Sequence, residues 1–237
     1  MAPGWDGATS VAGIDLAREA GVLTAVGFHP HVAADVTQAE RERIAELASD
    51  PLVRAIGETG LDYDRAFAPR DVQLANLRWH LTLARQSGKP LILHCRSKPG
   101  RRDAQDDLVR ELRDAGVGTG SFAERFHGRP PALLHSFSGP VDYAETALEL
   151  GCAVSISGLA FRAGEEPTAD VARIVPAERL LVETDAPYLS PPGAPRRNEP
   201  RWVEITARWV AVRRDVDPEV LGDQLVDAFD RTFGPPA

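Results

Sequence analysis

The residues of this sequence that could bind a metal ion share one position: each follows a short apolar run. They are His29 and His31 in GFHPH, Glu58 in AIGETG, His94 in LILHCRS, His135 in LLHSFSG and Asp185 in LVETDAPY. Imidazole nitrogens and carboxylate oxygens form the donor set of hydrolytic centres that use Zn²⁺, Mn²⁺ or similar ions. Such an ion lowers the pKa of water and polarises a phosphoryl oxygen, and two ions about 3.5–4 Å apart stabilise both the attacking and the leaving oxygen. The pattern therefore predicts a hydrolytic centre with one or two divalent ions.

The elements that must position these residues can also be predicted. The apolar runs have strand length and lie at 22–28, 53–57, 90–94, 132–135, 152–157 and 179–184. Apolar residues three or four apart predict helices at 37–49, 70–88, 104–116 and 142–151, with a longer connection at 116–131. Strands that are apolar throughout indicate a parallel sheet covered by helices. We therefore expect an α/β, TIM-like (β/α) barrel, in which the loops after the strands open on one face and bring the site residues together.

Length and composition limit the class of protein. The chain has 237 residues, of which 43% are hydrophobic, which suits one sizeable core, and we expect a single domain over 1–237. The 35 acidic and 27 basic residues give a net charge of -8, so a polyanion would have to be met by local bases. Arginines near the predicted mouth could supply them: Arg65, Arg96, Arg162, Arg196 and Arg197.

The location of the protein is predicted from what the sequence lacks. It has two cysteines, too few for a disulfide framework, which suits a reducing compartment. It has no apolar run near the ~20 residues of a membrane span, and its first residues, MAPGWDGATS, do not form a signal peptide. We expect a cytoplasmic protein that neither enters a membrane nor needs an obligate protein partner.

Each candidate residue also has an ordinary structural interpretation. A histidine at a strand end is more often hydrogen-bonded than metal-bound, Glu58 could hold a loop amide, and Asp185 before Ala-Pro could serve a turn. This interpretation weakens because the residues recur at the same place after buried runs, where an unpaired charge is costly. We leave His31 undecided, because Pro30 limits how the His-Pro-His pair can chelate one ion. We assign His80 and His127 structural roles.

Six segments together resemble the signature blocks of the TatD family of metal-dependent deoxyribonucleases. In chain order they are VGFHPH, AIGETGLDYD, PLILHCRS, LLHSFSG, LLVETDAPYLSP and RRNEP. The resemblance runs from about residue 14 to the C-terminus, and GETGLDY with ETDAPYL is its most specific part. It implies a (β/α)8 barrel, a one- or two-metal centre using Mg²⁺, Mn²⁺ or Zn²⁺, and phosphodiester hydrolysis, commonly by a 3′–5′ exonuclease.

The resemblance also implies roles for individual residues. Glu58 resembles the carboxylate that bridges two metals, and His94 and His135 resemble ligands of one ion. Asp185 resembles the acid that binds the other ion and orients the attacking water, with Glu183 as a supporting carboxylate. His29 resembles a catalytic-site histidine that contacts substrate phosphate or water. Arg96 and Asn198 match motif positions that we assign to substrate binding, as phosphate contact and loop anchor.

The sequence departs from the family in one respect. The family opens with a strand ending in His-x-His, and six predicted strands suggest a barrel without its first two. Because that would leave two unpaired strand edges, we favour a start assigned too far downstream. If the short chain is real, it keeps Glu58, His94 and His135, binds one ion, and works poorly or not at all.

Three functions of different classes follow. The first is a nuclease acting on DNA, and on RNA as a further possibility, in which Asp185 accepts the proton of a metal-activated water. The second is a metal-dependent hydrolase of an ester or amide, such as an acyl-tRNA deacylase, because fold does not choose the bond. The third is an inactive remnant that binds nucleic acid or protein.

Overall fold

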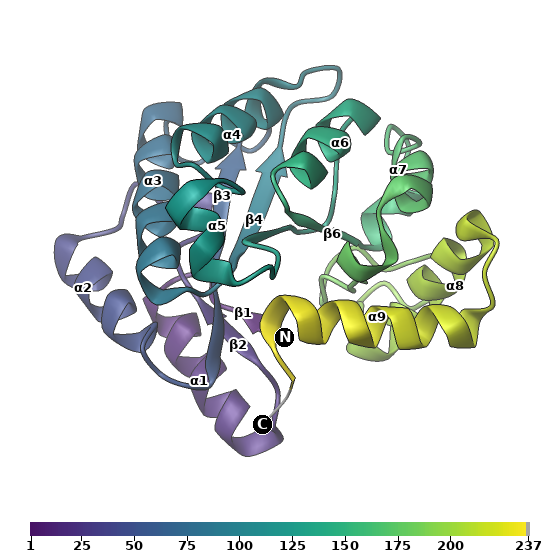
Figure 1. The fold of residues 1–237 in the computed structure, drawn as a ribbon, viewed down its shortest axis with the longest axis horizontal. Helices are drawn as coiled ribbons and strands as arrows, with labels where there is room; N and C mark the ends of the chain where they lie inside the picture. Colours follow the sequence, from purple (N-terminus) through teal and green to yellow (C-terminus); the bar gives the residue numbers. More distant parts are fainter. Residues whose placement is uncertain (236–237) are drawn as a thin grey trace.

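A curled sheet of parallel strands forms the centre of the computed structural model, which describes residues 1–235 (Figure 1). Along the sheet the strands follow their order in the chain. They are β1 (Ala2–Pro3), β2 (Thr24–Val26), β3 (Val53–Asp62), β4 (Leu91–Arg96), β5 (Ala132–Leu134), β6 (Ala153–Ile156) and β7 (Leu180–Val182). The fold is a TIM-like half-barrel, as the sequence predicted.

The expectation of six strands was wrong, because the described residues form a seventh strand, β1. Ala2 pairs with Thr24 and Pro3 with Ala25. Backbone N–H groups of Ala2 and Gly4 donate to the carbonyls of Leu23 and Ala25. Two residues are too few to form a hydrophobic pattern, so this strand depends on its pairing with β2.

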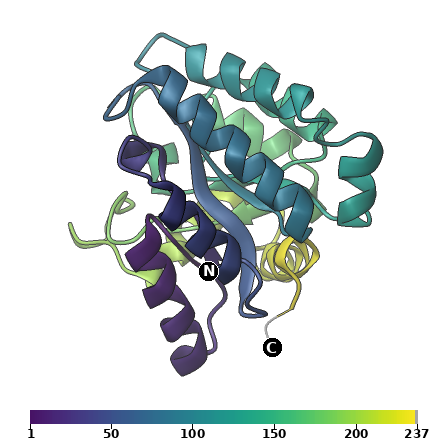
Figure 2. The same cartoon turned by 90° about the vertical axis from the view of Figure 1, so that its left-hand side faces the viewer.

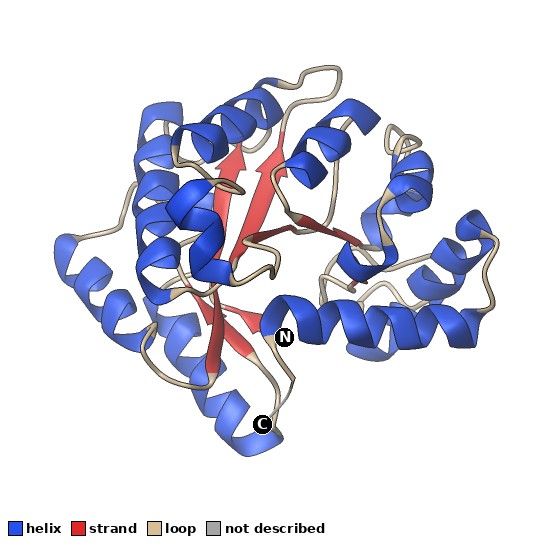
Figure 3. Ribbon diagram, in the orientation of Figure 1, coloured by secondary structure: helices blue, strands red, loops and turns tan. Residues whose placement is uncertain are grey.

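Helices lie between the strands and cover the outer face of the sheet (Figure 3). The four predicted helices are α2 (Gln38–Leu47), α3 (Arg70–Ser87), α4 (Asp103–Asp114) and α6 (Val141–Glu149). Further helices are α1 (Gly7–Ala20), α5 (Gly120–Phe126), α7 (Thr168–Ile174), α8 (Val203–Arg214) and α9 (Pro218–Phe233). Short 3-10 turns are η1 (Pro30–Val32), η2 (Gly158–Phe161), η3 (Ala177–Arg179) and η4 (Pro200–Trp202). The view in Figure 2 shows α3 in front of the long strand β3.

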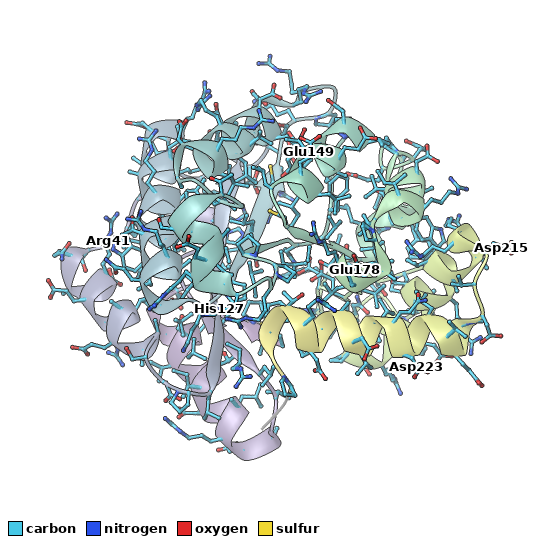
Figure 4. The ribbon with its side chains drawn as sticks, in the orientation of Figure 1. Arg41, His127, Glu149, Glu178, Asp215 and Asp223 are labelled. Atoms are coloured by element: carbon cyan, nitrogen blue, oxygen red, sulfur yellow. The ribbon has the colours of Figure 1, made fainter. Side chains whose placement is uncertain are left out.

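The outer surfaces of the helices carry charged side chains, such as Glu149 on α6 and Asp223 on α9 (Figure 4). Helix α5 forms inside the connection predicted at 116–131, and His127 caps its C-terminal end. In the part of the chain that the structure describes, none of the helices is both long enough and apolar enough for a membrane span.

Successive residues of each strand enter two different cores. Leu91, Leu93, Leu134 and Leu180 join the large cluster under the helices. Alternate residues, by contrast, form a second cluster inside the curl: Leu23, Ala25, Ala55, Ile92, Leu133, Ala153 and Leu181, closed by Phe233 at the end of α9. Because side chains alternate along a strand, burial on both faces produces the uninterrupted apolar runs of the sequence.

Candidate metal centre

The alternation that fills the inner core also places the polar residues at the carboxyl ends of the strands. His94 lies two residues after Ile92, His135 two after Leu133, and Glu183 two after Leu181. Because side chains two residues apart face the same side of a strand, each of these polar groups continues an inward-facing row. The apolar members seal the lower part of the curl, and the polar members line its mouth.

Glu58 faces the same mouth because of an irregularity in strand β3. The pairing of β3 with β4 shifts between Ile56 and Thr59, so one residue is extra in β3. Thr59 points toward α3, where its hydroxyl lies 3.2 Å from His80 Nδ1. A bulge of this kind re-aims the side chains that follow it, which leaves Glu58 facing inward. Gly57 permits the close approach, because a Cβ there would lie 2.6 Å from the Ile92 carbonyl oxygen.

The four residues expected to bind metal converge at this mouth. Glu58 Oε1 lies 3.0 Å from His94 Nδ1 and 3.7 Å from His135 Nε2. Asp185 Oδ1 lies 3.8 Å from His135 Nε2. Ligands about 2.1 Å from a tetrahedral ion are separated by about 3.4 Å, and these three contacts, at 3.0, 3.7 and 3.8 Å, lie near that separation. Carboxylate oxygens and imidazole nitrogens are also the donors that such an ion takes, so the donor set at the mouth fits a divalent ion.

The other nitrogen of each candidate ligand histidine contacts a carboxylate. His94 Nε2 lies 3.3 Å from Asp62 Oδ2, and His135 Nδ1 lies 2.6 Å from Glu183 Oε2. Glu183 also accepts from the Ser136 N–H and the Ser155 hydroxyl. Such carboxylates fix the ring orientation and leave the opposite nitrogen free for a metal. Glu183 was expected in this supporting role, whereas Asp62, which follows buried Leu61 in GLDYD, was missed.

His29 and His31 complete the group. His29 Nδ1 accepts the His31 backbone N–H at 3.2 Å, which places the ring proton on Nε2, 3.3 Å from Glu58 Oε1. His31 Nε2 lies 2.6 Å from Asp62 Oδ2. One ligand nitrogen from each of His29, His31 and His94 lies within 4.8 Å of the others, so these three could also hold an ion. His31, left undecided from the sequence, therefore belongs to the same cluster.

The charges of the cluster depend on one another. Burial alone would raise the pKa of Glu58, but His135, His29 and His94 outweigh burial and hold this pKa well below its usual value. Burial alone would lower the pKa of His135, but Glu183 and Glu58 raise it to about 10. Burial lowers the pKa of His29 to about 4. Asp62 and Glu58 likewise outweigh burial and raise the pKa of His94. His135 and His94 thus supply the positive charge that the buried carboxylates share.

Asp185 differs from Glu58 in its protonation. Burial raises its pKa to about 6, opposed by His135 and reinforced by the negative charges of Glu183 and Glu58. A carboxylate with a pKa near the working pH can both release and accept a proton, which is what a general base requires.

Metal affinity is expected to rise steeply with pH. An ion can bind only after three ligands have lost their protons: His135, whose pKa is raised to about 10, His94, whose pKa is also raised, and Asp185, whose pKa is raised to about 6. Release of one proton makes Kd fall about tenfold for each pH unit, so Mn²⁺ should bind at least about tenfold more tightly at pH 7 than at pH 6. Titration calorimetry in two buffers of different ionisation enthalpy will count the released protons. A Kd independent of pH would contradict this ligand set.

The two residues assigned to substrate binding lie in different surroundings. Arg96 lines the mouth and its Nε lies 2.9 Å from Asp64 Oδ2. Asn198 is 3% exposed, and its amide donates to the carbonyls of Thr184 and Tyr188. These contacts hold the loop after β7, so Asn198 would affect substrate only through that loop. His80 lies on the buried face of α3 and accepts the Phe28 N–H, consistent with a structural role.

The cluster forms part of the lining of an open cavity of about 1000 Å³. Its lining combines the carboxylates and histidines of the cluster with four arginines, Arg65, Arg96, Arg162 and Arg196. The cavity is therefore large enough for more than the groups around a single scissile bond.

Comparison with known proteins identifies close relatives. A model of the family "TatD related DNase" matches residues 1–234. The uncharacterized metal-dependent hydrolase YabD of Bacillus subtilis is 32% identical over 214 residues, covering 90% of this chain and 77% of YabD. The 3′-5′ ssDNA/RNA exonuclease TatD of Rahnella is 35% identical, covering 87% of this chain and 75% of that protein.

Solved structures agree on the fold. YjjV, a TatD homologue from Escherichia coli, superposes with a TM-score of 0.82 at 24% identity, covering 99% of this chain and 85% of YjjV. A TatD family hydrolase from Entamoeba histolytica superposes with a TM-score of 0.83 at 19% identity, covering 98% of this chain and 83% of that protein. The likeness extends over almost the whole chain in sequence and in fold, so this protein belongs to the TatD family of metal-dependent hydrolases.

Proposed function

We propose that the protein is an exonuclease that hydrolyses phosphodiester bonds of single-stranded DNA, and of RNA as well, from the 3′ end. The observation that carries the proposal is the convergence of Glu58, His94, His135 and Asp185 in the lining of an open cavity that is also lined by arginines. The Rahnella relative, named as a 3′-5′ ssDNA/RNA exonuclease, supports the choice of bond. The two free cysteines, Cys95 and Cys152, suit the cytoplasm.

Each residue has a separate task in the proposed reaction. Glu58, His94, His135 and Asp185 would hold one or two divalent ions, which lower the pKa of water and neutralise charge on a phosphoryl oxygen. Asp62 and Glu183 fix the two ligand rings. Asp185 takes the proton of the attacking water, and His29 donates to Glu58 and so keeps that carboxylate in place.

Arg96, two residues after the candidate ligand His94 on β4, is the proposed phosphate contact. Its guanidinium pairs with Asp64, and its side chain is 41% exposed, so it keeps donors free for a phosphate oxygen. Because a guanidinium presents two parallel donors, Arg96 can bind a phosphate while it remains paired.

The experiment that tests the proposal uses two single strands, one labelled at each end, with added Mg²⁺ or Mn²⁺. A 3′–5′ exonuclease releases mononucleotides at once from the 3′-labelled strand and shortens the 5′-labelled strand stepwise. Rapid turnover of aryl or aminoacyl esters without nucleotide release would favour the ester or amide hydrolase instead. Bound metal without turnover of either substrate would favour a binding protein.

A further inference from the structure

Two aromatic side chains at the cavity are exposed to an unusual degree. Phe67 is 66% exposed and Tyr188 is 68% exposed, and both line the cavity that contains the metal cluster. Exposed rings of this size leave apolar surface in contact with water. Such surface is typical of sites that bind a ligand or a partner. The two rings come from loops after different strands, β3 and β7.

Phe67 is held in place although it is exposed. Asp62 accepts the N–H groups of Asp64 and Arg65, and Gln73 donates to the Ala68 carbonyl. These contacts fix the loop on both sides of Phe67. The ring also meets His31 edge-on, with centroids 4.7 Å apart at 69°. The ring is therefore fixed by its loop and by one edge contact, and most of its surface stays free.

The Phe67 ring ends a row of rings along one wall of the cavity. Trp5 stacks on His29 with centroids 3.9 Å apart at 6°. His29 meets His31 at 4.3 Å, and His31 meets Phe67. The backbone of Trp5 is itself held, because its backbone N–H donates to the Thr9 hydroxyl in the cap of α1. The row therefore joins Phe67 directly to the metal cluster.

Tyr188 is fixed by its backbone alone. Its N–H donates to the Asp185 carbonyl at 2.8 Å, and its carbonyl accepts the Asn198 amide at 2.7 Å. Tyr188 follows Asp185 by three residues, so the loop that positions the proposed general base also positions this ring. With its backbone fixed, the side chain has only two torsions to lose when a flat partner packs against the ring.

Cations accompany the two rings. Arg65, Arg162 and Arg196 are exposed and line the same cavity. Aromatic faces together with guanidinium groups are the combination that binds single strands, because each base offers a π-face and each linkage carries one negative charge. Bases in a duplex are stacked on their neighbours and cannot offer their faces in this way.

We propose that Phe67 and Tyr188 are stacking platforms for two unpaired bases of the substrate strand. This inference rests on the proposed nuclease function and adds the groups that select unstacked nucleotides. Each ring adds to the binding affinity by packing on a base and not by contacting a phosphate. This part of the affinity is therefore lost when the base is removed.

Equilibrium binding tests the platforms without cleavage. Fluorescence anisotropy in EDTA will compare a labelled oligothymidylate with an oligomer of the same length whose sugars lack bases. Phe67→Ala and Tyr188→Ala should each raise Kd for oligothymidylate about tenfold and leave Kd for the abasic oligomer unchanged. Phe67→Leu should resemble Phe67→Ala because it lacks a π-face, and Phe67→Tyr and Tyr188→Trp should keep wild-type binding.

Two control variants separate stacking from charge and from surface changes in general. Arg196→Ala should raise Kd for both oligomers by the same factor, because a phosphate contact does not depend on the base. Val212→Ala, on α8 and 76% exposed, should change neither. If Phe67→Ala and Tyr188→Ala raise Kd equally for both oligomers, or change Kd for neither, the inference that these rings stack on bases is overturned. Cleavage of both oligomers with Mn²⁺ is measured in parallel: base-dependent binding without cleavage would overturn the nuclease and leave the platforms standing.

Discussion

Replacing Glu58 with glutamine is expected to lower kcat by roughly 10³-fold or more. Glu58 is 8% exposed, and His29, His94 and His135 all lie within 3.7 Å of its Oε1. Glutamine keeps the shape of the side chain but not the negative charge, and an ion bound here needs the charge. The measurement is the rate of nucleotide release with Mg²⁺ or Mn²⁺, together with the metal content of the purified variant.

The fold should survive this change. The Glu58 backbone N–H donates to the Gly4 carbonyl at 2.9 Å, and this bond does not involve the side chain. A thermal melt within a few degrees of wild type, with loss of bound metal, is the expected combination. Glu149→Gln on the outer surface of α6 is the matched control and should keep full activity. Full activity in Glu58→Gln would refute the role of Glu58 in holding metal.

Replacing Asp185 with asparagine is expected to lower kcat by roughly 10²–10⁴-fold, the usual contribution of a general base. Asparagine cannot accept the proton of the attacking water. The Asp185 side chain is 32% exposed and that of Glu58 only 11%, and Glu58 contacts three histidines, so Asp185→Asn should keep more metal than Glu58→Gln does. The two variants therefore separate loss of the ion from loss of the base.

The dependence of kcat on pH gives a second test of Asp185. The active form has lost its proton, so activity falls as pH decreases through the pKa of Asp185. In the metal-free protein this pKa is raised to about 6, and a neighbouring cation lowers it, so the acid limb should lie at or below pH 6. The limb should disappear in Asp185→Asn and persist in Asp223→Asn, a change on the surface of α9. An unchanged limb in Asp185→Asn would assign the proton transfer to another group.

The sequence by itself determined where the strands lie and which residues follow them. The runs around Ile92, Leu133 and Leu181 are apolar throughout because both faces of each strand are buried, and this property is visible without coordinates. His94 and His135 continue the inward row by the two-residue period of a strand, so their convergence follows from a parallel sheet alone. The family blocks added the roles, and the family itself is confirmed.

Tertiary structure decided what depends on pairing between distant segments. Strand β1 exists only through its bonds to β2, and Glu58 faces inward only because the pairing of β3 with β4 shifts at Gly57. A two-residue strand leaves no periodic signal, and a register shift belongs to two strands at once.

The same distinction applies to the side chains around the metal cluster. Asp62 and Glu183 become partners of His94 and His135 because separate strands bring them within hydrogen-bond distance. No pattern in the sequence distinguishes Phe67 and Tyr188 from other aromatic residues, and only the folded chain shows that their rings stay in water. Periodicity along the chain specifies which face a residue occupies, but exposure and contact depend on what the rest of the chain places opposite that face.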